Sequence, residues 1–495
     1  MNNLFILIKS MSKSEKRHFK LFTQAFGKKD SVYLKLFDAI DKQEEYDEAV
    51  LTKKMKVKHL SPYKKFLFEN ILKTLRIYHA EHNEAFQLID NFQNISLLRN
   101  RGLFKDALRV YERTYKKLKQ LHLYTFLVEL LNTGESLWLS YLPNKEMTDK
   151  LVDLQQEKLA YIEYAKSIVS YRALARDIKN MLRILHPLRS EEHEAEIFTL
   201  LQNPLLQDKK EAQTIIAQSL YYECQNMLHM AMLDYERVKI DAKEAVVFLE
   251  AQDDRSPVYY KTLVANLVTG LLACAKSKDD ALFQELEAKY EVFQKEVLAH
   301  KNVGTHFEVL IEKLYYNFKL HYWIEQNDFE TIIEMEEKVV VFWKKQQRFL
   351  DSDWRMTVGF FFAQAFFFNK QLDKAQAWVD ILLDEERNNP KIPCICNARI
   401  LNLMIQYEKK NFFLLYSLFC STKRYLNKNE RIFKGERVML NFFKWVGENE
   451  GSPHLNSKLD KLTQKLKEVC ADKYEKNFFQ EMKLEYWLNY LEVNQ

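Results

Sequence analysis

Apolar positions recur with the 3.6-residue period of an α-helix along nearly the whole chain. Several segments begin with a short polar turn, continue with an aromatic residue or a leucine, and then carry an apolar helical face. The clearest of these segments open at Phe104, Phe329, Leu372 and Phe412, and weaker ones open near Thr148, Glu191, Tyr235, Phe283 and Leu455. The pattern predicts that a helix begins at each opening.

The spacing of these openings indicates a helical repeat. Neighbouring openings lie 40–48 residues apart, a length that holds two helices and two short turns. The segments before them, such as 315–323, 360–368 and 400–407, are apolar on most sides, as helices packed between two neighbours are. A lone helical pair cannot bury both sides of its apolar face, so pairs must stack. We therefore predict an all-α solenoid of about nine helical hairpins in which each layer touches only adjacent layers.

One segment carries a motif with a family resemblance. A turn with Gly102 and Phe104 precedes Ala107 and Tyr111, which resembles the second helix of the tetratricopeptide (TPR) family. Small and large residues fall at that family's positions also at Ala363, Phe366, Leu372 and Ala375. The resemblance implies a TPR-like, right-handed superhelical α-solenoid. The chain departs from the family because it has no Trp-x-x-Leu-Gly, no unit ends in the usual proline, and the period exceeds about 34 residues. A HEAT-like array, with repeats of about 40–47 residues, is the alternative.

Three regions are expected along the chain. Residues 1–84 form a basic N-terminal helical segment, residues 85–450 form the TPR-like array, and residues 451–495 form a last repeat with a capping helix from about Lys473 to Leu491. The stretch 12–22 resembles the start of uncharacterised bacterial helical-repeat proteins, a resemblance that implies no activity.

The N-terminal segment differs from the rest in charge. Residues 1–80 contain 15 Lys and 2 Arg against 9 acidic residues, whereas the whole chain carries a formal charge of only +5. The basic residues concentrate at Lys53, Lys54, Lys56, Lys58, Lys64 and Lys65. Ser61 and Pro62 can start a helix there, with Phe66 and Ile71 among its inward residues.

This segment has two interpretations. Short helices followed by a turn and a longer helix could form a helix-turn-helix whose lysines neutralise DNA phosphates. The other interpretation is a solvated lysine face on the first helical layer. Arginine usually makes the bidentate contacts to guanine, and Arg17 and Arg76 both lie outside the lysine run, which weakens the DNA interpretation.

Composition argues against most enzyme classes. Glycine occurs only 9 times and proline 8 times in 495 residues, too few for a turn-rich β-protein or for the glycine-rich loops of a large α/β enzyme. No Gly-x-Gly, P-loop or Gly-x-Ser-x-Gly motif occurs. We therefore expect no catalytic residues, no cofactor and no metal site.

The cysteines, the apolar stretches and the predicted solenoid indicate where the protein is located and what it binds. The six cysteines fit neither a zinc site nor a redox motif, so we expect reduced and mostly buried thiols in a cytoplasmic protein. The longest apolar candidate, 357–368, is too short to span a membrane. We predict a scaffold that binds a partner protein or peptide on its concave surface. The alternative is a transcriptional regulator in which the basic segment binds DNA and the solenoid acts as a sensor.

Overall fold

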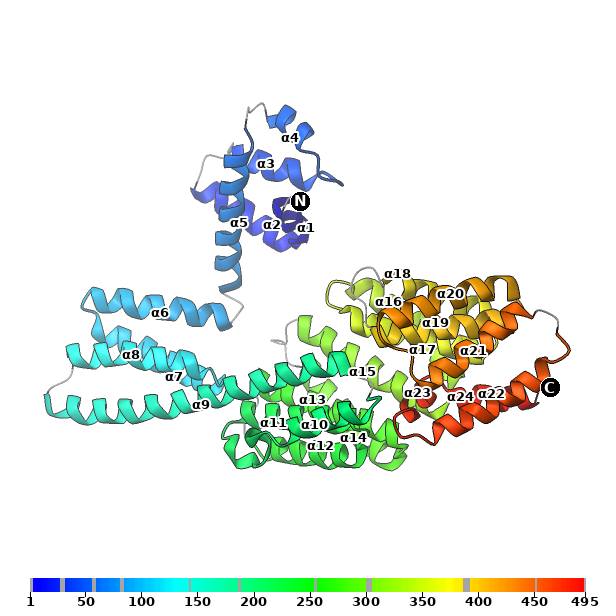
Figure 1. Ribbon diagram of the computed structural model, residues 1–495. Coiled ribbons are helices and arrows are strands. Elements are labelled where there is room, and N and C mark those ends of the chain that lie inside the picture. The colour runs from blue at the N-terminus through cyan, green and yellow to red at the C-terminus, as the bar shows by residue number, and fades with distance from the viewer. Residues whose placement is uncertain are drawn as a thin grey trace. The chain divides into compact units, whose positions relative to one another are not determined.

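The computed structural model describes residues 3–26, 32–55, 59–80, 84–141, 144–185, 188–252, 256–299, 305–385, 392–449 and 452–493. Within these ranges the chain forms α-helices, two short 3₁₀ helices and no strand, which confirms the all-α prediction (Figure 1). The helices belong to two compact units: unit 1 is Met1–Glu163 and unit 2 is Tyr164–Gln495. The boundaries expected near residues 84 and 450 fall inside these units and stay predictions.

Unit 1 contains eight helices and the first half of a ninth. They are α1 (Asn3–Ser10), α2 (Lys13–Phe26), α3 (Val32–Asp41), α4 (Glu48–Met55), α5 (Ser61–Ala80), α6 (Glu84–Asn100), α7 (Phe104–Gln120), α8 (Tyr124–Tyr141) and α9 (Asn144–Leu185). The first five helices enclose a small core that includes Ile8, Phe19, Phe37 and Ile71. Helices α6, α7 and α8 then pack consecutively.

Unit 2 holds the second half of α9 and all later helices. They are α10 (Glu191–Leu201), α11 (Ile215–Ala231), α12 (Tyr235–Glu250), α13 (Pro257–Ser277), α14 (Asp280–Ala299), α15 (Thr305–Gln326), α16 (Phe329–Gln346), α17 (Ser352–Phe368), α18 (Leu372–Glu385), α19 (Ile392–Glu408), α20 (Phe412–Lys428), α21 (Lys434–Glu448), α22 (Leu455–Cys470), α23 (Lys476–Glu481) and α24 (Leu484–Val493). The 3₁₀ helices are Pro204–Leu206 and Lys209–Glu211.

The odd-numbered helices of unit 2 form an inner series. Helices α11, α13, α15, α17, α19 and α21 pack one on the next. All of them except α15 also pack on the helices before and after them in the chain, whereas α15 packs on α16 and on α13. A helix with neighbours on both sides must be apolar all round, and α17 is: every residue from Val358 to Phe368 is buried. The phenylalanines at 360–362 and 366–368 are thus core residues, as predicted.

The tight turns that connect α11, α13, α15, α17 and α19 to the next helix in the chain share one geometry. Leu233, Lys278, Asn327, Lys370 and Lys410 each adopt a left-handed backbone conformation, with φ between 56° and 61°. The next residue donates its backbone N–H to a carbonyl five positions earlier, as Asp328 does to Trp323 at 2.9 Å. That residue then starts the following helix, since the Asp328 carboxylate accepts from the N–H of Thr331 at 3.2 Å. One short motif therefore ends a helix and caps the next without glycine.

Most of the predicted helix openings are confirmed. Helices begin at Phe104, Glu191, Tyr235, Phe329, Leu372, Phe412 and Leu455, which are seven of the nine predicted residues. The opening near Phe283 begins three residues earlier, at Asp280. The opening near Thr148 is wrong because α9 runs unbroken for 42 residues. Its sequence contains no glycine or proline, so nothing stops the helix.

The C-terminal segment overturns two expectations. A single final helix from Lys473 to Leu491 was expected, but α23 and α24 are separated at Met482 and Lys483, where Lys483 has a φ of 52°. Nor does each layer touch only adjacent layers. Lys483 Nζ lies 2.6 Å from Glu325 Oε2 on α15, and Gln364 Nε2 on α17 donates to the Glu481 carbonyl at 2.6 Å. The apolar side of α24, with Trp487 at 1% exposure, is buried by this return across the inner series.

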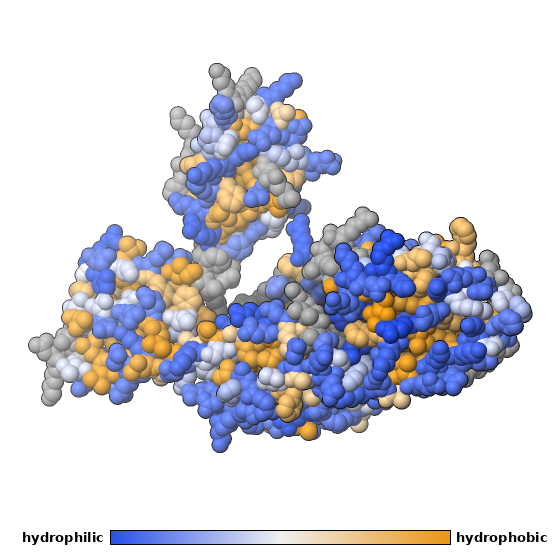
Figure 2. All heavy atoms as spheres, viewed as in Figure 1, coloured by the Kyte–Doolittle hydropathy of each residue, from blue (hydrophilic) through white to orange (hydrophobic). Residues whose placement is uncertain are grey.

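Polar side chains cover much of the face seen in Figure 2, with apolar patches between them. Among the described residues one stretch, Val258–Ser277, is long and apolar enough to cross a membrane, and 67% of its most apolar window is buried within the protein. This stretch, and not 357–368 as the sequence indicated, is the longest apolar candidate among the described residues. Of the six cysteines, Cys224, Cys274, Cys394 and Cys396 are buried, Cys470 is half-buried and Cys420 is exposed.

Candidate binding site

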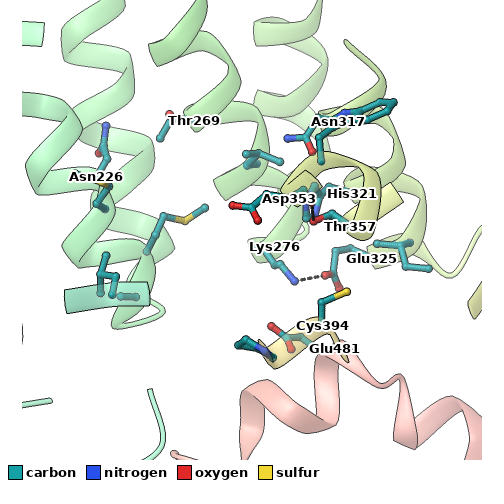
Figure 3. A pocket seen from close by; sticks show the side chains of 18 of the residues that line it. Asn226, Thr269, Lys276, Asn317, His321, Glu325, Asp353, Thr357, Cys394 and Glu481 are labelled. Atoms are coloured by element: carbon teal, nitrogen blue, oxygen red, sulfur yellow. Dashed lines mark hydrogen bonds and ion pairs between the residues drawn. The ribbon is translucent and has the colours of Figure 1, made fainter. Parts of the chain in front are cut away.

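The inner helices of unit 2 line a cavity of about 880 Å³ (Figure 3). Its wall comes mainly from α11, α13, α15, α17 and α19, with Lys179 and Leu182 from the end of α9, and the C-terminal segment around α23 closes one side. Such volumes are typical of ligand sites, which range over about 300–1,000 Å³. These helices present both polar and apolar side chains to a shared space.

The closed side of the cavity holds a buried charge cluster. Glu325 Oε1 lies 2.5 Å from Lys276 Nζ, and its Oε2 lies 2.6 Å from Lys483 Nζ. Burial alone would raise the pKa of Glu325, but the two ammonium groups lower it to about 2. Burial lowers the pKa of Lys483, whereas Glu325 and Glu481 overcome burial and raise that of Lys276. The carboxylate therefore stays ionised and joins α13, α15 and the C-terminal segment.

Neutral side chains hold the adjoining Glu481. Asn397 Nδ2 donates to Glu481 Oε2 at 2.9 Å, and Asn477 Nδ2 donates to Oε1 at 3.1 Å. Gln364 binds the backbone carbonyl of the same residue. Each of α15, α17 and α19 thus contacts the C-terminal segment through a polar side chain in this apolar surrounding.

The open side of the cavity carries amides, hydroxyls and a carboxylate. Asn226 on α11 is 3% exposed, and its Oδ1 has no hydrogen-bond partner within the described residues. Thr269 and Thr357 donate their hydroxyls to the backbone carbonyls of their own helices at 2.9 Å. Figure 3 shows the Asp353 carboxylate directed into the open space between these helices.

A second buried cluster joins the start of unit 2 to its end. Arg189 Nη2 lies 2.6 Å from Glu436 Oε2 and 2.8 Å from Glu475 Oε2. Glu475 also accepts from the backbone N–H groups of Lys434 at 3.0 Å and Gly435 at 3.1 Å, so it caps the start of α21. A Cβ at position 435 would lie 2.6 Å from the Phe478 ring, so glycine permits this close approach. Burial raises the pKa of Glu436 to about 7, although Arg189 opposes the rise.

Neither cluster was predicted from the sequence, although α15 carried a readable signal. Asn317, His321 and Glu325 stand four residues apart on α15, and all three line the cavity. A polar stripe of that spacing marks one helical face. Among the described residues no group of three or more His, Cys, Asp or Glu side chains is placed to hold a metal ion.

The lysines proposed for nucleic-acid binding lie in unit 1 and are not equivalent. Lys53 and Lys54 on α4 and Lys65 on α5 are exposed, whereas Lys64 Nζ is bonded to Glu48 Oε1 at 2.8 Å. Lys64 thus already has a counter-charge. Lys56 and Lys58 lie outside the described residues. The DNA interpretation of this segment stays a prediction.

The sequence predicts a helix from Tyr63 to Ala80 with Ser61 as its cap, and α5 begins slightly earlier, at Ser61 itself. One of its inward residues was predicted wrongly, because Phe66 is 47% exposed while Ile71 is fully buried. The ring of Phe66 instead rests against Tyr33, with centroids 4.3 Å apart.

No family model, no curated protein and no solved structure matches this chain.

Proposed function

We propose that unit 2 is a TPR-like array of helical hairpins, part of a solenoid of about nine, that binds a peptide segment of a partner protein on its inner face. The protein acts as a non-catalytic scaffold in the cytoplasm. The observation that carries the proposal is the chain's own C-terminal segment, which already lies on that inner face.

This segment is an example of the contacts that the inner face makes with a polypeptide. Gln364 reads a backbone carbonyl, while Glu325 and Asn397 pair with side chains of Lys483 and Glu481. Glu408 on α19 accepts from the Trp487 indole at 3.0 Å. The inner series therefore offers alternating backbone and side-chain recognition, which is what an elongated peptide needs.

The cavity continues this surface beyond the C-terminal segment. Asn226 on α11 and Asn317 on α15 extend the series of carboxamides. A carboxamide offers both N–H donors and a C=O acceptor, so it can satisfy both polar groups of a peptide unit. The wall spans five helices, which favours an elongated ligand over a compact one.

The turn geometry supports the repeat interpretation. The same left-handed residue followed by a helix start recurs at Leu233, Lys278, Asn327, Lys370 and Lys410. Equivalent joints at similar spacing are typical of tandem helical hairpins.

Site-specific photo-crosslinking in the native cell tests the proposal. A photoreactive residue replaces Asn317 in the cavity, and in a matched variant it replaces Val341, which is 59% exposed on α16. We expect polypeptide adducts from position 317 that position 341 does not give, identified by mass spectrometry. The same adducts from both positions, or none from position 317, would contradict binding in the cavity.

A further inference from the structure

The lysines around the cavity all form salt bridges, whereas among the described residues not all of its carboxylates do. All four lysines in its wall have carboxylate partners: Lys179 pairs with Glu223 at 2.6 Å, Lys313 pairs with Asp351, and Lys276 and Lys483 share Glu325. No ammonium group of the wall is thus left free for an acidic ligand.

Among the described residues two carboxylates of the same wall form no salt bridge, although Glu481 acts on the ammonium group of Lys276 and raises its pKa. Within the described residues neither Asp353 nor Glu481 forms a salt bridge, and Glu481 receives only the neutral amides of Asn397 and Asn477. Asp353 is exposed in the first turn of α17, and Glu481 is half-buried at the end of α23. In Figure 3 both carboxylates face the open space of the cavity. Counting Asp351, five carboxylates stand against four ammonium groups.

A separate observation shows that the polar wall is not satisfied internally. Asn226 is nine-tenths buried or more, lines the cavity from the opposite helix, and has an unpartnered Oδ1. A buried carbonyl without a partner costs free energy that a ligand donor would recover. The Asn226 carbonyl and the two carboxylates therefore favour a ligand with hydrogen-bond donors, and the carboxylates also favour a ligand with positive charge.

We propose that the cavity recognises its peptide through a cationic group, an amine or a guanidinium, that the negative charges of Asp353 and Glu481 attract. This inference rests on the proposed function and specifies its ligand. An ammonium group has three donors and no acceptor, and a guanidinium has five donors, so either can bind a carboxylate of the wall.

The remaining wall suits the stem of such a side chain. Met227 and Met230 on α11 and the rings of Phe360 and Phe361 on α17 also line the cavity. The methylene stem of a lysine or arginine packs on such apolar surfaces while its head reaches a carboxylate. A glutamate in the same place would add a further negative charge where every ammonium group is already paired.

Affinity selection with defined peptides tests this inference. The full-length protein is incubated with N-acetylated, C-amidated hexapeptide pools that differ only in one fixed residue, Lys, Arg, Gln or Glu, and retained peptides are identified by mass spectrometry. We expect the Lys and Arg pools to be retained at least about tenfold better than the Gln and Glu pools, as a charge-assisted hydrogen bond predicts. Asp353→Asn and Glu481→Gln should each remove most of that preference.

Controls separate this inference from the proposed function. Asp384→Asn, an exposed change on α18 away from the cavity wall, should keep the preference. Thermal unfolding of each variant establishes that it is folded. Retention of peptides without regard to charge, or a preference that survives Asp353→Asn and Glu481→Gln, would overturn the cationic inference and leave peptide binding intact. Binding of free spermidine without retention of any peptide pool would overturn the peptide ligand itself.

Discussion

Arg189 Nη2 lies 2.8 Å from Glu475 Oε2, although 286 positions separate the two residues in the sequence. The guanidinium stacks on the Phe433 ring, 4.4 Å from its centroid, and lies 5.3 Å from that of Phe478. The side chains of Arg189 and Glu475 are 2% and 3% exposed. One buried cation therefore joins the beginning of unit 2 to its C-terminal segment.

Loss of this cation should destabilise unit 2 strongly. Arg189→Ala leaves Glu436 and Glu475 buried together without a counter-charge, so we expect a loss of about 3–5 kcal/mol in the free energy of unfolding. Chemical denaturation followed by circular dichroism measures it. Arg176→Ala, which breaks an exposed pair with Asp177, should change stability by less than about 1 kcal/mol. Equal losses in the two variants would show that the buried cluster is not the cause.

Glu436 should make stability depend on pH in a defined window. Its pKa is about 7 in the folded protein against an ordinary value of 4.5, so the folded state holds the proton more tightly. The contribution of this group to the free energy of unfolding therefore falls as pH rises from about 4.5 to about 7. Glu436→Gln removes the titration, so its stability relative to the natural protein should increase over this range, by up to about 3 kcal/mol.

Thermal unfolding at pH 5, 6, 7 and 8 measures this difference. Glu325 provides the opposite case, because its pKa of about 2 gives stability that is present above 4.5 and lost only at lower pH. A constant difference between the Glu436→Gln variant and the natural protein from pH 5 to pH 8 would contradict the raised pKa.

The left-handed turn residues should tolerate glycine better than helical positions do. Lys410 has a φ of 56°, which costs a residue with a Cβ about 1–2 kcal/mol. Because glycine also gains entropy in the unfolded chain, Lys410→Gly should be neutral or stabilising by up to about 1 kcal/mol. Arg424→Gly, within α20, should instead destabilise by about 1 kcal/mol. Urea denaturation of both variants measures the contrast, and equal losses would refute the turn assignment.

Packing of α24 on the inner helices should depend on Trp487. Truncation by Trp487→Ala removes a side chain with 1% exposure and its hydrogen bond to Glu408, so we expect a loss of about 3–5 kcal/mol. Limited proteolysis should then cut the C-terminal segment faster than in the natural protein. Asn489→Ala, an exposed change on the same helix, is the matched control and should leave both measurements unchanged.

Local patterns predicted most of the helices because their causes are local. Tyr235, Phe329 and Phe412 follow a polar residue whose side chain caps the helix within three residues, so a short window of sequence contains the whole signal. The error at Thr148 has a local cause too, since a regular period was imposed on a stretch that has no helix breaker.

The candidate site could not be predicted in the same way. Glu325 and Lys483 are 158 residues apart, and the local sequence around each does not show which residue it pairs with. Which face of α15 turns inward depends on how the C-terminal segment returns across it. The polar stripe at Asn317, His321 and Glu325 could have marked the face, but not its partners.

The link between Arg189 and Glu475 has a consequence for how the protein comes apart. An open row of repeats frays from its free ends, one hairpin after another, because the terminal hairpins have neighbours on one side only. In unit 2 the beginning and the C-terminal segment contact each other through Arg189 and Glu475. Local unfolding of either end therefore also destabilises the other. We expect unit 2 to melt in a single cooperative step instead of peeling.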